Sequence, residues 1–264
     1  MKVFDRFVFV HLAKTGGTFV EEVLKSLHCP SQLGQKIHSM RRRWGIKIPL
    51  YPYQYREYKK HAWCRSIPPE DQHKVIMACI RNPYDLYVSH YKFNWWRKYP
   101  DLFFPRNAEL MRRATSEPDN ITFAEWVQGV CHEEHGAANR RASLPGVEIG
   151  WQSCEFACYF SRDPNHVLGQ PTESEMAAAF EQSKYNVKFL RMETLNESLY
   201  RFLVDVGYPE EQVAFIRTLG KIYPGKQTRS SSDSVQHVYT PELKALIRQK
   251  ERLLFAIFPE YDQK

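Results

Sequence analysis

The first residues that could do chemistry form a short turn near the start of the chain. An apolar run ends there, and Lys14, Thr15, Gly16, Gly17 and Thr18 follow before a helical pattern begins. A helix N-terminus offers N–H donors and about half a positive charge, and glycines let a ligand approach the backbone closely. Lysine adds a full charge and the threonines add hydroxyl donors. The stretch therefore predicts an anion-binding loop, although such a turn is also common as a plain connection.

This loop differs from the nucleotide-binding loop G-x-x-x-x-G-K-[ST]. Lys14 precedes the glycines, so Thr15, the hydroxyl residue that follows it, does not stand at the helix start, where it would bind magnesium. The order of residues therefore disfavours an ATP or GTP hydrolase.

A second segment, Lys74–Tyr91, also has the pattern of a strand, a turn and a helix. Asn82 suits the N-cap of that helix and Pro83 its first position. Arg81 then falls at the carboxyl end of a strand, where open α/β sheets bind ligands, and Ser89 lies about two turns into the helix. A guanidinium and a hydroxyl can hold one phosphate together. A nucleotide with phosphates at both ends of its ribose would use both sites.

The elements that must position these residues alternate along the chain. Strand-like runs occur at Phe7–Val10, Lys74–Ile80 and Val187–Leu190, and each is followed by a helical pattern. This order predicts a single α/β domain over residues 1–264 with a mainly parallel sheet.

Several helix ends are marked in the sequence. Thr122 and Thr172 each begin a capping box with a glutamate three residues later, and Thr240 precedes a proline and an acid. Gly207 is expected to end one helix, and the apolar residues of Leu243–Phe258 predict one long final helix.

Three stretches interrupt this pattern, at residues 44–58, 100–120 and 140–171. We expect them to be insertions that form the mouth for a substrate, because loops on an α/β core often do so.

The composition favours a folded protein with an anionic partner. The chain has 264 residues, of which 43% are hydrophobic, and 37 Lys and Arg against 30 Asp and Glu give a formal charge of +7. No signal peptide or membrane span is visible, so a cytoplasmic location and reduced cysteines are expected. A zinc site is a weak alternative, because its candidate ligands match no usual spacing; these are Cys131, His132, His135, Cys154 and Cys158.

At these motifs the chain resembles the PAPS-dependent sulfotransferases, which use 3′-phosphoadenosine-5′-phosphosulfate (PAPS). The stretch from His11 to Thr18 is similar to the family's "HIPKTGGT" loop, which holds the 5′-phosphosulfate. Arg81-Asn82-Pro83, with Ser89, is similar to the element that binds the 3′-phosphate. The resemblance implies a three-layer α/β fold like that of P-loop NTPases, with a central mainly parallel sheet flanked by helices.

Two later stretches also resemble family landmarks. Residues 187–198 are similar to a strand-to-helix segment, although Met192 replaces a tyrosine often found near the adenine, so that contact is not transferred. Residues 229–247 resemble an element whose basic loop reaches the 3′-phosphate. Arg229 and Ser230 are the candidates there.

The resemblance implies transfer of the sulfuryl group to a hydroxyl or amine, with release of 3′-phosphoadenosine 5′-phosphate (PAP) and no required metal. Lys14 would stabilise the charge that develops, and a histidine would act as general base. His61 lies in a Lys-His-Ala sequence similar to that of relatives with this loop type, and His38 is the second candidate. An Asp or Glu from one of the insertions stays an alternative general base.

Two other functions stay open from the sequence. Basic pairs and triples, together with Trp95, Trp96 and Tyr99, would suit a nucleic-acid-binding module. The second open function is an ATP-dependent kinase that acts on a small molecule and has an unusual phosphate loop. For a sulfotransferase, the loop type and the arginine runs favour a glycan acceptor, and a small molecule is the alternative.

Overall fold

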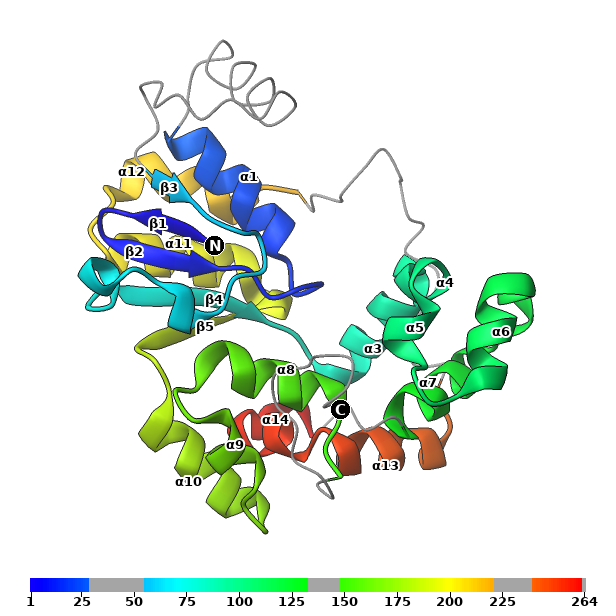
Figure 1. Cartoon of the computed structure of the whole chain (residues 1–264). Coiled ribbons are helices and arrows are strands. Elements are labelled where there is room, and N and C mark those ends of the chain that lie inside the picture. Colours follow the sequence, from blue (N-terminus) through cyan, green and yellow to red (C-terminus); the bar gives the residue numbers. More distant parts are fainter. Residues whose placement is uncertain (29–54, 133–147, 221–238, 263–264) are drawn as a thin grey trace. The chain divides into compact units, whose positions relative to one another are not determined.

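The computed structural model describes residues 1–28, 55–132, 148–220 and 239–262, which divide into two compact units (Figure 1). Unit 1 contains Met1–Arg81 and Asn186–Arg229, and unit 2 contains Asn82–Tyr185 and Ser230–Lys264. Each unit has its own hydrophobic core. That both units fold as one domain over residues 1–264 stays a prediction.

Unit 1 is built on a five-stranded sheet with the order β3-β1-β2-β4-β5. Its strands are β1 (Lys2–Phe4), β2 (Phe7–Val10), β3 (Tyr55–Glu57), β4 (Val75–Ile80) and β5 (Val187–Arg191). The three strands expected from the sequence are β2, β4 and β5, and they are adjacent and parallel. Those predictions are confirmed.

The sheet is mixed rather than mainly parallel, which corrects the expected architecture. β1 pairs antiparallel with both β2 and β3. Asp5 and Arg6 alone connect β1 to β2, so the chain reverses in a two-residue hairpin, which only antiparallel strands permit. The rings of Phe4 and Phe7 stack across this hairpin with their centroids 4.6 Å apart.

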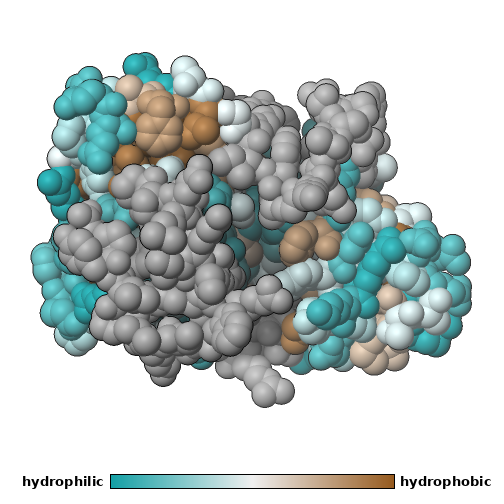
Figure 2. Space-filling view, turned by 90° about the horizontal axis from the view of Figure 1, so that it is seen from above, coloured by the Kyte–Doolittle hydropathy of each residue, from teal (hydrophilic) through white to brown (hydrophobic). Residues whose placement is uncertain are grey.

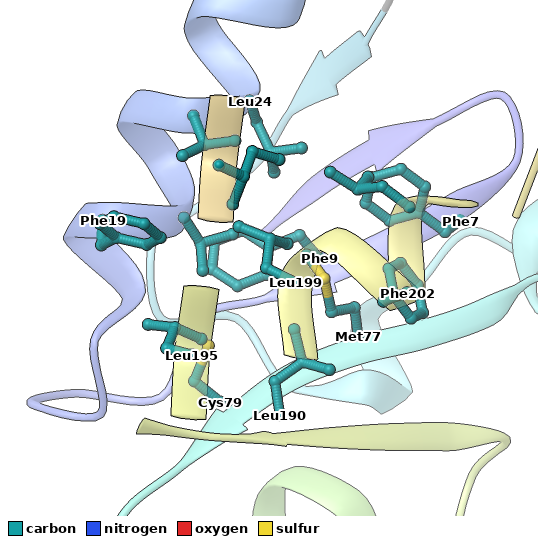
Figure 3. Packing of buried hydrophobic residues seen from close by; sticks show 14 of the residues in the cluster. Phe7, Phe9, Phe19, Leu24, Met77, Cys79, Leu190, Leu195, Leu199 and Phe202 are labelled. Carbon is teal, nitrogen blue, oxygen red and sulfur yellow. The ribbon is translucent and has the colours of Figure 1, made fainter. Parts of the chain in front are cut away.

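Helices flank this sheet, and two of them cover one of its faces. Phe7 and Phe9 of β2 pack with Met77 and Cys79 of β4, as alternate residues of a strand share a face (Figure 3). Apolar side chains of α1 (Gly17–His28) and α11 (Leu195–Asp205) close over them. The remaining helical segments of unit 1 are η1 (Cys64–Ser66), η2 (Pro69–Asp71), η4 (Met192–Thr194), α12 (Glu210–Val213) and η5 (Ala214–Thr218).

Gly207 ends α11 as predicted. Its φ of +91° is in the left-handed region, and its N–H donates to the carbonyl of Val204 at 2.8 Å.

Apart from an isolated β-bridge between Ser161 and Lys184, the regular structure of unit 2 is helical in the residues described. Its α-helices are α3 (Pro83–Phe93), α4 (Trp95–Lys98), α5 (Pro100–Phe103), α6 (Ala108–Ser116), α7 (Phe123–His132), α8 (Trp151–Phe160), α9 (Pro164–Leu168), α10 (Glu173–Ser183), α13 (Pro241–Lys250) and α14 (Arg252–Ile257), with the short 3₁₀ segments η3 (Pro118–Asn120) and η7 (Pro259–Tyr261). Tyr87, Trp96 and Trp126 are among the fully buried side chains of its core.

The predicted caps are present in unit 2. Thr172 and Glu175 form a full capping box at the start of α10, and Thr122 and Glu125 exchange the same bonds before α7. The hydroxyl of Thr240 accepts from an amide of α13. These helix starts are confirmed.

The prediction of a single long final helix was wrong, because the helix is interrupted at Glu251, between α13 and α14. The Glu251 carboxylate is buried and accepts from the N–H groups of Gln152 and Ser153 at 3.2 and 2.7 Å, and from the Tyr87 hydroxyl at 2.7 Å. The carboxylate therefore pairs with N–H groups in the first turn of α8, which have no partner within that helix. The sequence pattern of an amphipathic helix does not indicate such a role for Glu251.

The expected insertions are partly regular structure. Residues 55–57 of the first one form β3, at an edge of the sheet, and the second one contains α5, α6 and η3. The third one contains α8 and α9. Residues 44–54 and 140–147 lie outside the described residues, and a role in a substrate mouth stays a prediction.

Among the coloured residues of Figure 2, hydrophilic ones cover most of the surface and apolar ones form separate patches. The large apolar side chains with the greatest exposure are Tyr58, Phe93, Trp95, Tyr99, Leu102 and Phe215. Within the described ranges, every helix is too short or too polar to cross a membrane.

Candidate functional site

The predicted anion loop lies between the end of β2 and the start of α1. Lys14 and Gly16 both adopt left-handed backbone conformations, with φ of +63° and +95°. The N–H of Phe19 donates to the carbonyl of Gly16 at 3.0 Å, so the helix begins immediately after Gly16. The amides of Gly17 and Thr18 then lie in the first turn, where no helical carbonyl precedes them. Such a turn presents backbone N–H groups to an anion.

Thr15 differs from its expected use as a hydroxyl donor. Its side chain is fully buried, and its Oγ1 donates to the carbonyl of Leu12 at 2.9 Å. The hydroxyl therefore holds the turn together, and only the backbone of Thr15 stays a candidate to contact a ligand.

Both glycines are packed against neighbouring side chains. A Cβ on Gly16 would lie 2.8 Å from Cδ2 of Leu195 and 3.5 Å from Cγ of Met192. A Cβ on Gly17 would lie 2.4 Å from Nε2 of His11. A side chain would therefore be strained at both positions even before a ligand binds, at Gly16 mainly because of its positive φ and at Gly17 because of the His11 ring. Met192, the first residue of η4, lies beside Gly16.

Arg81 follows β4, which is the parallel neighbour of β2. Because carboxyl ends of parallel strands meet at one edge of a sheet, the arginine and the loop are close. Nη1 of Arg81 donates to the backbone carbonyl of Lys14 at 3.4 Å. The structure therefore places Arg81, one residue of the second predicted motif, next to the loop within unit 1.

The residues after Arg81 belong to unit 2. Asn82 caps α3 as predicted, since its Oδ1 accepts from the N–H of Tyr84 at 2.9 Å, and Pro83 is the first residue of the helix. Ser89 lies in α3 and is largely buried. Its part in phosphate binding stays a prediction.

His61, the favoured general base, lies close to the loop. Its Nδ1 is 3.1 Å from the carbonyl oxygen of His11, and the two imidazole rings meet edge to face with centroids 5.2 Å apart. Partial burial lowers the pKa of His61 below 6.5, against the opposing effect of its bond to the His11 backbone. A carbonyl only accepts hydrogen bonds, so Nδ1 carries the proton and Nε2 of the neutral ring carries the basic lone pair.

His11 is held by an acid that the sequence did not single out. Its Nδ1 lies 3.2 Å from Oε1 of Glu21, in α1. Burial lowers the pKa of His11, although the hydrogen bond with Glu21 opposes this. Burial alone would raise the pKa of Glu21, but the contact with His11 and nearby positive charges lower it to about 2. The pair is therefore a neutral imidazole that donates to a carboxylate. Glu21 lies four residues after Gly17, a helical spacing that could have indicated it.

Three candidates lie outside the described residues. They are His38, Arg229 and Ser230.

The described residues contain no cluster of His, Cys, Asp or Glu that could hold a metal ion. For the zinc alternative, Cys131, Cys154 and Cys158 are buried thiols, and His135 lies outside the described part of the chain. Burial raises the pKa of Cys131 to about 12, so this thiol is protonated at neutral pH.

The aromatic residues expected to stack on a ligand differ in exposure. Trp95 is half exposed, whereas Trp96 is fully buried and its indole donates to the carbonyl of Tyr91. Trp96 is therefore a core residue, and its predicted stacking role was wrong.

Comparisons with protein-family models, with curated proteins and with solved structures find no match to this chain.

Proposed function

We propose that this protein is a sulfotransferase that moves the sulfuryl group of PAPS to an acceptor hydroxyl or amine and releases PAP. The observation that carries the proposal is the contact between Arg81 and the carbonyl of Lys14. It brings a guanidinium next to a helix N-terminus with two tightly packed glycines. A nucleotide with one phosphate group at each end of its ribose suits two adjacent anion-binding elements.

In the proposed complex, the amides of Gly16, Gly17 and Thr18 bind the 5′-phosphosulfate, and Lys14 neutralises charge on its bridging oxygen. Arg81 binds the 3′-phosphate. A guanidinium has five N–H donors, so its bond to the Lys14 carbonyl is compatible with this role. Ser89, Arg229 and Ser230 remain proposed further contacts to that phosphate.

The transfer step needs a base for an acceptor hydroxyl. The acceptor oxygen forms a bond to sulfur while the bond from sulfur to the bridging oxygen of PAPS breaks, and that electron pair leaves with PAP. The acceptor proton passes to Nε2 of His61, whose Nδ1 proton is already bonded to the His11 carbonyl. Positioning and charge neutralisation then supply most of the acceleration.

The wider proposal follows the same resemblance. The sheet and its flanking helices would form a three-layer, P-loop-NTPase-like sulfotransferase fold, with a cytoplasmic location and a glycan or small molecule as acceptor. The formal charge of +7 favours an anionic acceptor such as an acidic glycan.

The direct test is incubation with PAPS labelled with radioactive sulfur and a panel of glycans, phenols and amines. Transfer of label to one acceptor class, together with thermal stabilisation by PAP in the absence of magnesium, is expected. Consumption of ATP that depends on magnesium would instead support a kinase. Binding to oligonucleotides that weakens steeply with salt, without PAP binding, would support a nucleic-acid-binding module.

A further inference from the structure

One carboxylate contacts both chain segments that surround the proposed base. Oε1 of Glu21 lies 3.2 Å from Nδ1 of His11, directly before the loop, and Oε2 lies 3.3 Å from Nζ of Lys60, the residue before His61. The Glu21 side chain is only 13% exposed, and the His11 side chain is 6% exposed. The carboxylate therefore ties α1 to both segments: water screens its contact with His11 weakly, and it screens the ion pair with Lys60, whose side chain is 42% exposed, more strongly.

The hydrogen bonds fix which nitrogen of each ring carries its proton. Glu21 is ionised at neutral pH, because its pKa is about 2, and a carboxylate only accepts. His11 must therefore donate through Nδ1. Its carbonyl in turn accepts from Nδ1 of His61 at 3.1 Å. Glu21 thus holds the residue whose backbone selects the tautomer of His61.

The packing of His11 also constrains this arrangement. Nε2 of its ring would be 2.4 Å from a Cβ on Gly17, so the ring lies against the start of α1. A displacement of His11 would move the carbonyl to which His61 is bonded. Loss of Glu21 would remove the hydrogen bond to Nδ1 of His11, on the edge of the ring away from Gly17.

We propose that Glu21 is a positioning residue: it holds His11 and Lys60 so that His61 keeps its proton on Nδ1 and presents Nε2 as the base. The catalytic consequence rests on the proposed function. The orientation of His61 is a property of the protein without substrate. It can therefore be measured independently of any transfer reaction.

The neighbouring residue supplies a matched control. Glu22, also in α1, forms an exposed ion pair with Lys25. Replacing Glu22 removes one carboxylate from the same helix turn without touching His11 or Lys60. A general effect of charge or of helix stability would appear in both Glu21→Ala and Glu22→Ala, whereas a positioning effect would appear only in the first.

The test measures the full chain in two ways. Nitrogen NMR of the histidine rings, with His61 assigned from a His61→Gln spectrum, gives the tautomer without substrate. In Glu21→Ala we expect His61 to shift from the Nδ1–H tautomer towards a mixture of the two neutral tautomers. The kcat should fall roughly ten- to a hundredfold while KM for PAPS changes little, as expected for a misplaced catalytic group. Glu21→Gln, whose amide oxygen can still accept a hydrogen bond from His11, should recover part of the Nδ1–H tautomer and part of kcat. Glu22→Ala should match the wild type in both measurements.

An unchanged His61 tautomer in Glu21→Ala would overturn the inference, and so would an unchanged kcat when transfer is measurable. If Glu21→Ala does not fold, the same two readings are taken on Glu21→Gln, with a smaller shift expected in each. A wild-type protein that transfers nothing from PAPS would reject the proposed function. The tautomer would then still decide whether Glu21 positions His61.

Discussion

Nη1 of Arg81 lies 3.4 Å from the backbone carbonyl of Lys14, so the end of β4 and the loop after β2 are joined by one hydrogen bond. These residues are 67 positions apart in the chain. Their contact follows from the parallel pairing of β2 with β4, in which Val10 lies opposite Ala78. It is the geometric basis of the predictions for nucleotide binding.

The first prediction concerns the affinity for PAP. Arg81→Ala should raise the dissociation constant of PAP roughly ten- to a hundredfold, because a hydrogen bond to a charged group contributes about 1.5–3 kcal/mol. Isothermal calorimetry measures this directly. Arg201→Ala is the control, since Arg201 is an exposed residue of α11 that pairs with Glu197. Equal affinity in Arg81→Ala and the wild type would exclude the proposed role of Arg81.

The second prediction separates stability from function at Lys14. A non-glycine residue held at φ +63° destabilises the folded state by about 1–2 kcal/mol. Glycine avoids this strain, and the conformational entropy that it loses on folding destabilises the protein by less. Lys14→Gly should therefore unfold at the same temperature as the wild type or a higher one, yet lose transfer from PAPS. Asn94→Gly relieves the same backbone conformation at the end of α3, with φ +60°, and should keep transfer. Thermal unfolding and the labelled-sulfate assay measure both effects, and activity retained in Lys14→Gly would contradict the role of its ammonium group.

The strands and helix starts that the sequence predicted depend on local signals. Thr172 and Glu175 are three residues apart, and each satisfies a donor of the other's backbone, so the start of α10 needs no distant contact. The same holds for Asn82 before α3. Central strands such as β2 are apolar throughout because both of their faces are buried.

The features that were missed depend on contacts between distant residues. β3 has the sequence Tyr-Arg-Glu and is paired to β1 across more than 50 residues, so neither composition nor periodicity marks it as a strand. The turn at Asp5 and Arg6 lacks the glycine or asparagine of common two-residue hairpins. Likewise, only the folded backbone places Glu21 beside His11 and Lys60. The strand, turn and helix of the loop can be predicted from its sequence, whereas the partners of a supporting residue such as Glu21 cannot.

The third prediction concerns the pH dependence of transfer. Burial lowers the pKa of His61 below 6.5, so the imidazole stays neutral, and able to accept a proton, to lower pH than an ordinary histidine. The acidic limb of kcat/KM should therefore fall at a pH below 6.5. His61→Ala should lower kcat by ~10²–10⁴-fold and remove this limb, whereas His73→Ala, at an exposed position of unit 1, should leave both unchanged. An acidic limb that persists in His61→Ala would assign the base to another group.

The fourth prediction tests the packing of the loop. Gly17 is a helical residue without a positive φ, so alanine suits its backbone and would normally favour the helix by about 1 kcal/mol. Its Cβ would however meet the His11 ring at 2.4 Å. Gly17→Ala should therefore destabilise the protein by about 1–3 kcal/mol in urea unfolding, whereas Gly220→Ala, with open space at its Cβ, should not. In a double mutant with His11→Ala the two losses should not add, and simple additivity would show that the ring does not cause the effect.

The last prediction concerns unit 2 and the pH dependence of its stability. Burial, together with the nearby Glu251 and against a hydrogen bond from Trp151, raises the pKa of Glu155 from 4.5 to about 7. The folded state thus binds a proton more tightly than the unfolded state, so the free energy of unfolding should fall as the pH rises from about 4.5 to about 7. Glu155→Gln stays neutral and should flatten this slope in urea unfolding measured across that range. Glu173→Gln is the control, because Glu173 pairs with Arg248 on the surface, and it should leave the slope intact. If Glu155→Gln keeps the wild-type slope, another acid titrates in that window, and Glu155 is ionised in the folded protein.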